Sequence, residues 1–130
     1  MTPGWASEIV RGECTAAGVA EPAIRWRHAR RSASSGVTRR SAGSISVTAG
    51  TDPLDQRLTL LHELAHWLGP VPRRRRGRVQ HHDARFYAIA FDLYRRHEIP
   101  DEEILARAAA IRARCATPGR WGSRALMPRG

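Results

Sequence analysis

Lysine is absent from this chain of 130 residues: all 22 of its basic residues are arginine. The net charge of +10 suggests contact with acidic partners such as nucleic acid. Selection for phosphate binding alone would not remove lysine, because lysine also binds phosphate well. The missing lysine is more typical of codon bias in a GC-rich genome, so the charge by itself does not establish a nucleic-acid partner.

Cysteines and long apolar runs are also scarce. The chain has two cysteines, Cys14 and Cys115, which lie far apart in the sequence and do not form a disulfide scaffold. We expect each to be a small buried apolar residue. No apolar run approaches the roughly 20 residues of a membrane-spanning helix, and the N-terminus lacks the layout of a secretory signal. These absences predict a cytoplasmic monomer with no membrane partner.

The chain does have an ordinary hydrophobic fraction of 42%, which argues against disorder. Its length suits one domain with a single core. The last stretch, ATPGRWGSRALMPRG, shows no periodic pattern. We therefore expect one domain over residues 1–115 and a flexible tail over residues 116–130.

Alternation and helical periodicity predict an α+β fold. Residues 23–28 (AIRWRH) and 44–50 (SISVTAG) alternate as half-buried strands do, and a short irregular strand is expected around Val37. A helix over residues 5–17 precedes them, and three helices follow. We expect a small antiparallel sheet of two or three strands, packed against these helices.

The first of the three following helices, predicted over residues 53–68, carries clear start and stop signals. Asp52 can cap its first turn, a proline follows at the first helical position, and Gly69 and a second proline end it. Two further helices are predicted to begin at Asp83 and Asp101, each with apolar residues along one face.

The capped helix contains the pattern H-E-x-x-H at His62, Glu63 and His66. Residues four apart share one face of a helix, with Cβ atoms about 5–6 Å apart, so both imidazoles can bind one ion at about 2.0–2.1 Å. Glu63 lies beside that ion, where its carboxylate can accept a proton from water. Chance would produce this pattern in about 0.01 of chains with this many histidines and glutamates. The motif therefore predicts a zinc site.

Zinc needs a third protein ligand, and several residues are candidates. The extended pattern H-E-x-x-H-x-x-G-x-x-H fails, because Pro72 occupies its last position. A carboxylate from the following helix is a second option. The candidates are Asp83, Asp92 and Glu98. The last two need an unusual tilt to reach the ion. A histidine after the intervening loop, either His81 or His82, is the third option, because closing that loop costs little entropy.

The stretch LLHELAHWL followed by HDARFY resembles the SprT-like and WLM-domain (minigluzincin-type) zinc metallopeptidases, including small metallohydrolases of actinobacteria. Their pattern is H-E-x-x-H, a loop of variable length, then H-(G/D)-x-x-F and a helix. The resemblance spans residues 23–94 and implies a zincin-like core that binds one Zn²⁺ ion. It also implies that His82, rather than His81, joins His62 and His66 as the third ligand.

The resemblance further implies hydrolysis of peptide bonds in a protein or peptide substrate, with Glu63 as the general base. In the similar peptidases an extended peptide pairs with the edge strand that leads into the active helix, and here that strand would be residues 44–48. The group that stabilises the oxyanion stays open. Tyr87, Tyr94, His81 and a loop arginine are the candidates.

The segment between the two motifs, PVPRRRRGRVQ, contains two prolines, a glycine and a run of arginines, so we interpret it as an exposed loop. A solvated loop is one reading of such a charge run, and contact with DNA or RNA phosphates is the other. The arginines concerned are Arg73, Arg74, Arg75, Arg76 and Arg78. The similar peptidases degrade proteins crosslinked to DNA, which makes the second reading attractive, but a run of charges is more often a solvated loop.

Two other functions stay open at this point. One is a non-catalytic, basic nucleic-acid-binding protein whose zinc only braces two helices. The other is a repressor-cleaving peptidase similar to ImmA and IrrE. The HDARFY stretch argues against it, because those proteins have a different second motif.

Overall fold

The computed structural model describes residues 1–75 and 77–115, so the predicted tail over residues 116–130 lies outside the described residues. The described elements are α1 (Gly4–Ala17), β1 (Ala23–His28), β2 (Ser35–Arg39), β3 (Ser44–Ala49), α2 (Pro53–Leu68), β4 (Arg73–Arg75), β5 (Arg78–Gln80), α3 (Ala84–Arg96) and α4 (Asp101–Cys115). The predicted α+β arrangement is confirmed. None of the described helices is long and apolar enough to cross a membrane.

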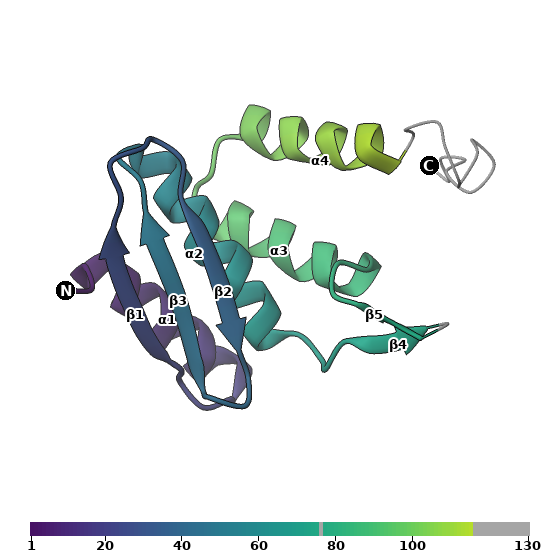
Figure 1. Ribbon diagram of the computed structural model, residues 1–130, viewed down its shortest axis with the longest axis horizontal. Helices are drawn as coiled ribbons and strands as arrows, with labels where there is room; N and C mark the ends of the chain where they lie inside the picture. The colour runs from purple at the N-terminus through teal and green to yellow at the C-terminus, as the bar shows by residue number, and fades with distance from the viewer. Residues whose placement is uncertain (76, 116–130) are drawn as a thin grey trace.

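The three-stranded sheet is mixed, so the prediction of an antiparallel sheet is wrong for one of its two pairings. The strand order is β1-β3-β2 (Figure 1), with β1 parallel to β3 and β2 antiparallel to it. The segment after β1, which is rich in turn residues, forms the strand β2. The next strand, β3, then lies between β1 and β2. Because β3 is the central strand, the prediction that residues 44–48 form the edge strand is also wrong. β2 is the edge strand beside α2.

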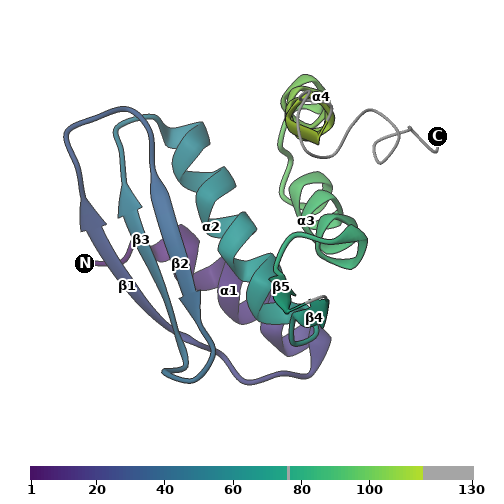
Figure 2. The ribbon, with the colours of Figure 1, turned by 45° about the vertical axis from the view of Figure 1, so that its right-hand side comes forward.

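The helix α2 lies between the sheet and α3 (Figure 2), which explains its apolar character. Four of its leucines are buried, and the core continues into α1, β3 and α3. The largest fully buried side chains are Ile45, Leu60, Leu61, Leu64, Leu93, Val10, Val47 and Cys14. Burial of Cys14 agrees with its predicted apolar role, whereas the side chain of Cys115 lies outside the described part of the chain.

The arginine-rich segment is a short hairpin, so its interpretation as a loop without regular structure is wrong. β4 and β5 pair antiparallel, with Arg75 opposite Arg78. The turn is tight, and Gly77 adopts a φ of +78°, which glycine allows at little cost. The side chains of both strands lie outside what the structure describes, so their contact with nucleic acid stays a prediction.

Candidate metal centre

The N-terminus of α2 is capped as the sequence predicts. The side chain of Asp52 accepts hydrogen bonds from the backbone N–H groups of Leu54, at 3.0 Å, and Asp55, at 3.5 Å. These bonds satisfy N–H groups that the first helical turn leaves without partners. The cap fixes where α2 begins and therefore which residues of the motif face the sheet.

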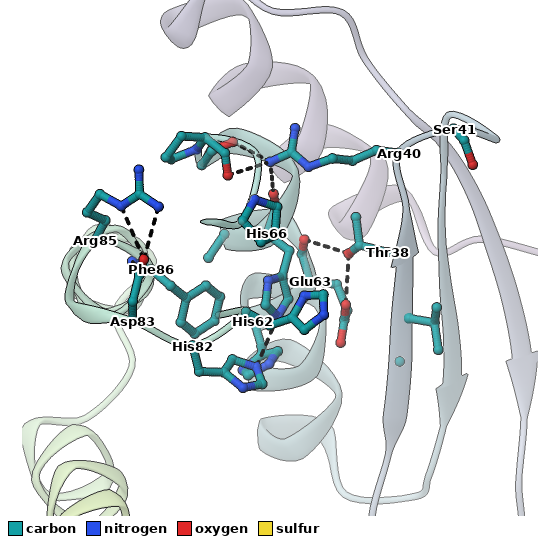
Figure 3. A pocket seen from close by; sticks show the side chains of 17 residues that line it. Thr38, Arg40, Ser41, His62, Glu63, His66, His82, Asp83, Arg85 and Phe86 are labelled. Atoms are coloured by element: carbon teal, nitrogen blue, oxygen red, sulfur yellow. Dashed lines mark hydrogen bonds and ion pairs between the residues drawn. The ribbon is translucent and has the colours of Figure 1, made fainter. Parts of the chain in front are cut away.

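The C-terminus of α2 is held by Arg40, which lies between β2 and β3. Its guanidinium donates to the backbone carbonyl oxygens of His66, Gly69 and Pro70 (Figure 3). A cation at this end of a helix is stabilised by the helix dipole and satisfies carbonyls that have no partner within the helix. Arg40 therefore fixes the turn of backbone that carries His66.

Three imidazoles converge between α2 and the start of α3 (Figure 3). His62 and His66 come from α2, and His82 precedes α3. Their candidate ligand nitrogens all lie within 4.8 Å of one another, and the Nε2 atoms of His66 and His82 are 3.1 Å apart. Two nitrogens bound to tetrahedral zinc at about 2.0–2.1 Å lie about 3.3–3.4 Å apart. The separation of the His66 and His82 nitrogens is close to this value, and the three donors lie near enough together to hold one metal ion.

The alternative third ligands lie elsewhere. The ring of His81 is 6.4 Å from that of His66, centroid to centroid, whereas the ring of His82 is 4.9 Å away. Among the described residues, Asp83, Asp92 and Glu98 belong to no group of three with ligand spacing. The side chain of Asp83 caps α3, and that of Asp92 pairs with an arginine one turn later.

The position of His82 is set by the first turn of α3. Asp83 Oδ1 accepts a hydrogen bond of 3.0 Å from the backbone N–H of Phe86, so His82 stands immediately outside the helix. Phe86 is only 6% exposed, and its ring lies 4.9, 4.2 and 4.9 Å from the rings of His62, His66 and His82. This buried ring limits the rotation of all three imidazoles.

Glu63 is a buried carboxylate beside the three imidazoles, with 7% of its surface exposed. Thr38 Oγ1, on β2, lies 2.8 Å from both Glu63 Oε1 and the Glu63 carbonyl oxygen, so its one hydrogen can be donated to either. Burial raises the pKa of Glu63, and the hydrogen bond from Thr38 partly offsets that rise. A carboxylate with a raised pKa is a stronger base than an exposed one.

β2 passes very close to this carboxylate. A Cβ atom added at Gly36 would lie 2.7 Å from Glu63 Cγ, a distance that real Cβ contacts do not reach. Gly36 leaves space for the side chain of Glu63, and Thr38 can donate a hydrogen bond to its carboxylate. Sequence reasoning missed both, because the segment around them is rich in serine and arginine and has little apolar alternation.

The two helical histidines are neutral at physiological pH. Burial, and then the neighbouring imidazoles, lower the pKa of His62 to about 4 and that of His66 to about 4. A smaller part of the shift at His62 comes from the positive charge of Arg107 on α4. Neutral imidazole is the form that binds a metal ion, so burial prepares these side chains for coordination.

We expect the metal-free protein to lose stability as the pH falls from about 6.5 toward 4. The pKa values of His62 and His66 are lower in the folded chain than their ordinary value of 6.5, so the unfolded chain binds more protons in this interval. The contribution of these two neutral imidazoles to the free energy of unfolding is fully present above pH 6.5. It is lost progressively as the pH falls from 6.5 toward 4. Urea unfolding of chelator-treated protein across this interval measures the effect.

The double variant His62→Gln/His66→Gln should show a shallower dependence of unfolding free energy on pH. His28→Gln, at an exposed histidine, is the matched control and should keep the wild-type dependence. An unchanged slope in the double variant would contradict the expectation.

The three imidazoles and Glu63 line an open cavity of about 620 Å³. This volume lies within the range of about 300–1,000 Å³ that is usual for ligand sites. One wall is β2, through Gly36, Val37 and Thr38, and the opposite wall is the start of α3. The cavity therefore has room for a ligand beside Glu63.

The oxyanion candidates occupy different places. His81 lines the large cavity, and Tyr94 is buried and lines a smaller pocket that also contains Glu63. The ring of Tyr87 is 6.2 Å from that of His82. The side chains of the hairpin arginines lie beyond the described residues.

No protein-family model, curated protein or solved structure matches the chain. The resemblance to SprT-like and WLM-domain peptidases therefore rests on two short motifs and stays a prediction. Function has to be inferred from the chemistry of the site.

Proposed function

We propose that this protein is a zinc-dependent peptidase, with His62, His66 and His82 as zinc ligands and Glu63 as the general base. One observation carries the proposal: a buried carboxylate lies beside three converging imidazoles at the wall of an open cavity. A structural zinc site usually has four protein ligands. In the described part of the chain only three donors group together, which favours a catalytic site over a bracing one.

Zinc, when bound, supplies Lewis acidity that lowers the pKa of water and polarises a carbonyl group. The chain supplies the proton transfers. Thr38 can donate to Glu63 Oε1, so Oε2 is the oxygen that accepts a proton from the attacking water. Glu63 then returns that proton to the leaving amine. Burial raises the pKa of Glu63, which makes its carboxylate a better proton acceptor.

The sheet edge supports an extended polypeptide as substrate. In the described sheet β2 pairs with β3 on one side only, and its residues line the large cavity. An extended peptide can add to such an edge by backbone hydrogen bonding, which places its peptide bonds beside Glu63. The substrate class that fits is therefore a flexible or unfolded segment of protein.

The basic composition extends the proposal to substrates associated with DNA. The net charge of +10 favours approach to nucleic acid, and the arginines of β4 and β5 come directly after α2 in the chain. DNA would then concentrate the peptidase near its substrates without taking part in the chemistry.

Removing the metal should abolish hydrolysis. We expect the purified protein to hold one zinc ion per chain, to lose cleavage of an unfolded protein such as casein after chelation, and to recover it when zinc is restored. Metal content by emission spectrometry and product formation by mass spectrometry provide the measurements. A protein that binds no zinc, or that cleaves nothing when loaded, would overturn the proposal.

A further inference from the structure

A second pocket, of about 180 Å³, is lined by His62 and Glu63 together with residues of β2, α2, α3 and α4. It shares Gly36, His62 and Glu63 with the large cavity, so the two meet at the proposed base. Its volume is below the range of about 300–1,000 Å³ for whole ligands. A space of this size suits one side chain or one chain end of a substrate.

Arg107 brings a positive charge to this pocket from α4. Its NH2 atom is 3.6 Å from Asp55 Oδ1, which is too long for a good hydrogen bond. The other oxygen of Asp55 already accepts the backbone N–H of Ser34. Within the described part of the chain, Arg107 Nε is buried and has no hydrogen-bond partner, although the side chain as a whole is 41% exposed. Asp55 therefore attracts the guanidinium electrostatically but leaves its Nε–H group without a hydrogen-bond acceptor.

The unsatisfied donor indicates the chemistry of the missing partner. A buried N–H group without an acceptor is costly, and a guanidinium binds a carboxylate through two parallel N–H donors. The other lining residues include the neutral side chains of Ser35, Leu58 and Thr59 and the phenol of Tyr94. Arg107 is thus the group in this pocket that can bind an anion.

We propose that Arg107 binds a carboxylate group of the substrate in this small pocket. The enzyme then prefers peptide bonds close to an acidic side chain or to a free C-terminus. The inference rests on the proposed peptidase function, because it takes the substrate to be a peptide lying across Glu63.

Peptide binding to the zinc-loaded Glu63→Gln variant tests the inference without turnover. The probes are short alanine-rich peptides that carry one glutamate, placed at a different position in each peptide. Each has a counterpart with glutamine at the same position. Every peptide is made both with a free and with an amidated C-terminus. We expect an acidic peptide or a free-acid peptide to bind about 10- to 100-fold more tightly than its neutral partner. The pair that shows the difference identifies the source of the carboxylate.

Adding Arg107→Gln should remove this difference, and Arg107→Lys should keep part of it. Arg95→Gln, at an exposed arginine on α3, is the matched control and should keep all of it. Zinc content and urea unfolding show whether each variant is folded. Equal binding of all peptides by the parent protein, or an acidic preference that survives Arg107→Gln in a folded protein, would overturn the inference.

Turnover by the enzyme with Glu63 intact separates this inference from the proposed function. Cleavage with no preference for acidic or free-acid peptides would contradict the role of Arg107 but support the proposed peptidase function. Carboxylate binding that depends on Arg107, without any cleavage, would support the role of Arg107 and contradict the proposed peptidase function. If Arg107→Gln lowers kcat equally for acidic and neutral peptides and leaves KM unchanged, Arg107 stabilises the oxyanion instead, and the inference is wrong.

Discussion

Replacing Glu63 with glutamine is expected to lower peptide hydrolysis by about 100- to 10,000-fold, which is the usual contribution of a general base. The amide has nearly the same shape as the carboxylate but cannot accept a proton. Its oxygen can still accept the hydrogen bond from Thr38 that Oε1 accepts in the wild type. A neutral amide is also cheaper to bury than a charged carboxylate, so the fold should be retained. Initial rates of casein cleavage measure the loss.

Zinc content and urea unfolding complete the test of Glu63→Gln. We expect both to match the wild type, because Glu63 lies beside the histidines without belonging to the group with ligand spacing. Glu8→Gln, at an exposed glutamate of α1, is the matched control and should keep full activity. Activity within a few-fold of the wild type would rule out Glu63 as the base. Loss of zinc would identify it as a ligand instead.

Replacing His82 with alanine is the second large change that we expect. His82 contributes one of three converging nitrogens, and its Nε2 atom lies 3.1 Å from that of His66. Removing one ligand should weaken zinc binding by about 100-fold or more, since several ligands share the total binding free energy. Hydrolysis should disappear with the metal. Competition with a zinc-binding dye gives the affinity.

His81→Ala is the matched control for His82→Ala, because the two histidines are adjacent in the chain and both exposed. The ring of His81 lies farther from that of His66 than the ring of His82 does. We expect this variant to bind zinc nearly as tightly as the wild type. The opposite result, with zinc lost from His81→Ala and kept by His82→Ala, would reverse the assignment of the third ligand.

Much of the site could be anticipated because its signals are local. A cap at Asp52, a motif with spacing four, and an Asp83–Phe86 pair at a helix start each depend on neighbours within about one helical turn. The structure accordingly has α2 and α3 where the patterns predict them, with His82 beside the first turn of α3.

The parts that could not be anticipated depend on contacts between distant residues. Alternation indicates that a strand exists but not which strand lies beside it, so the central position of β3 had no local signal. Thr38 and Arg40 reach α2 across 25 or more positions of sequence, and Arg107 reaches the second pocket from α4. The hairpin was missed because a run of arginines hides the usual alternation of a strand.

The close passage of β2 over Glu63 makes strand pairing itself a condition for the proposed catalysis. Gly36 and Thr38 lie against the carboxylate, whereas the alternate positions, Ser35 and Val37, are exposed, Ser35 at the small pocket and Val37 at the large cavity. A shift of one residue in the pairing of β2 with β3 would exchange these two sets. The hydroxyl that holds Glu63 would then face solvent, and a bulky side chain would press on the base. If the protein is the proposed peptidase, misregistered molecules that fold and keep the three histidines together would be inactive.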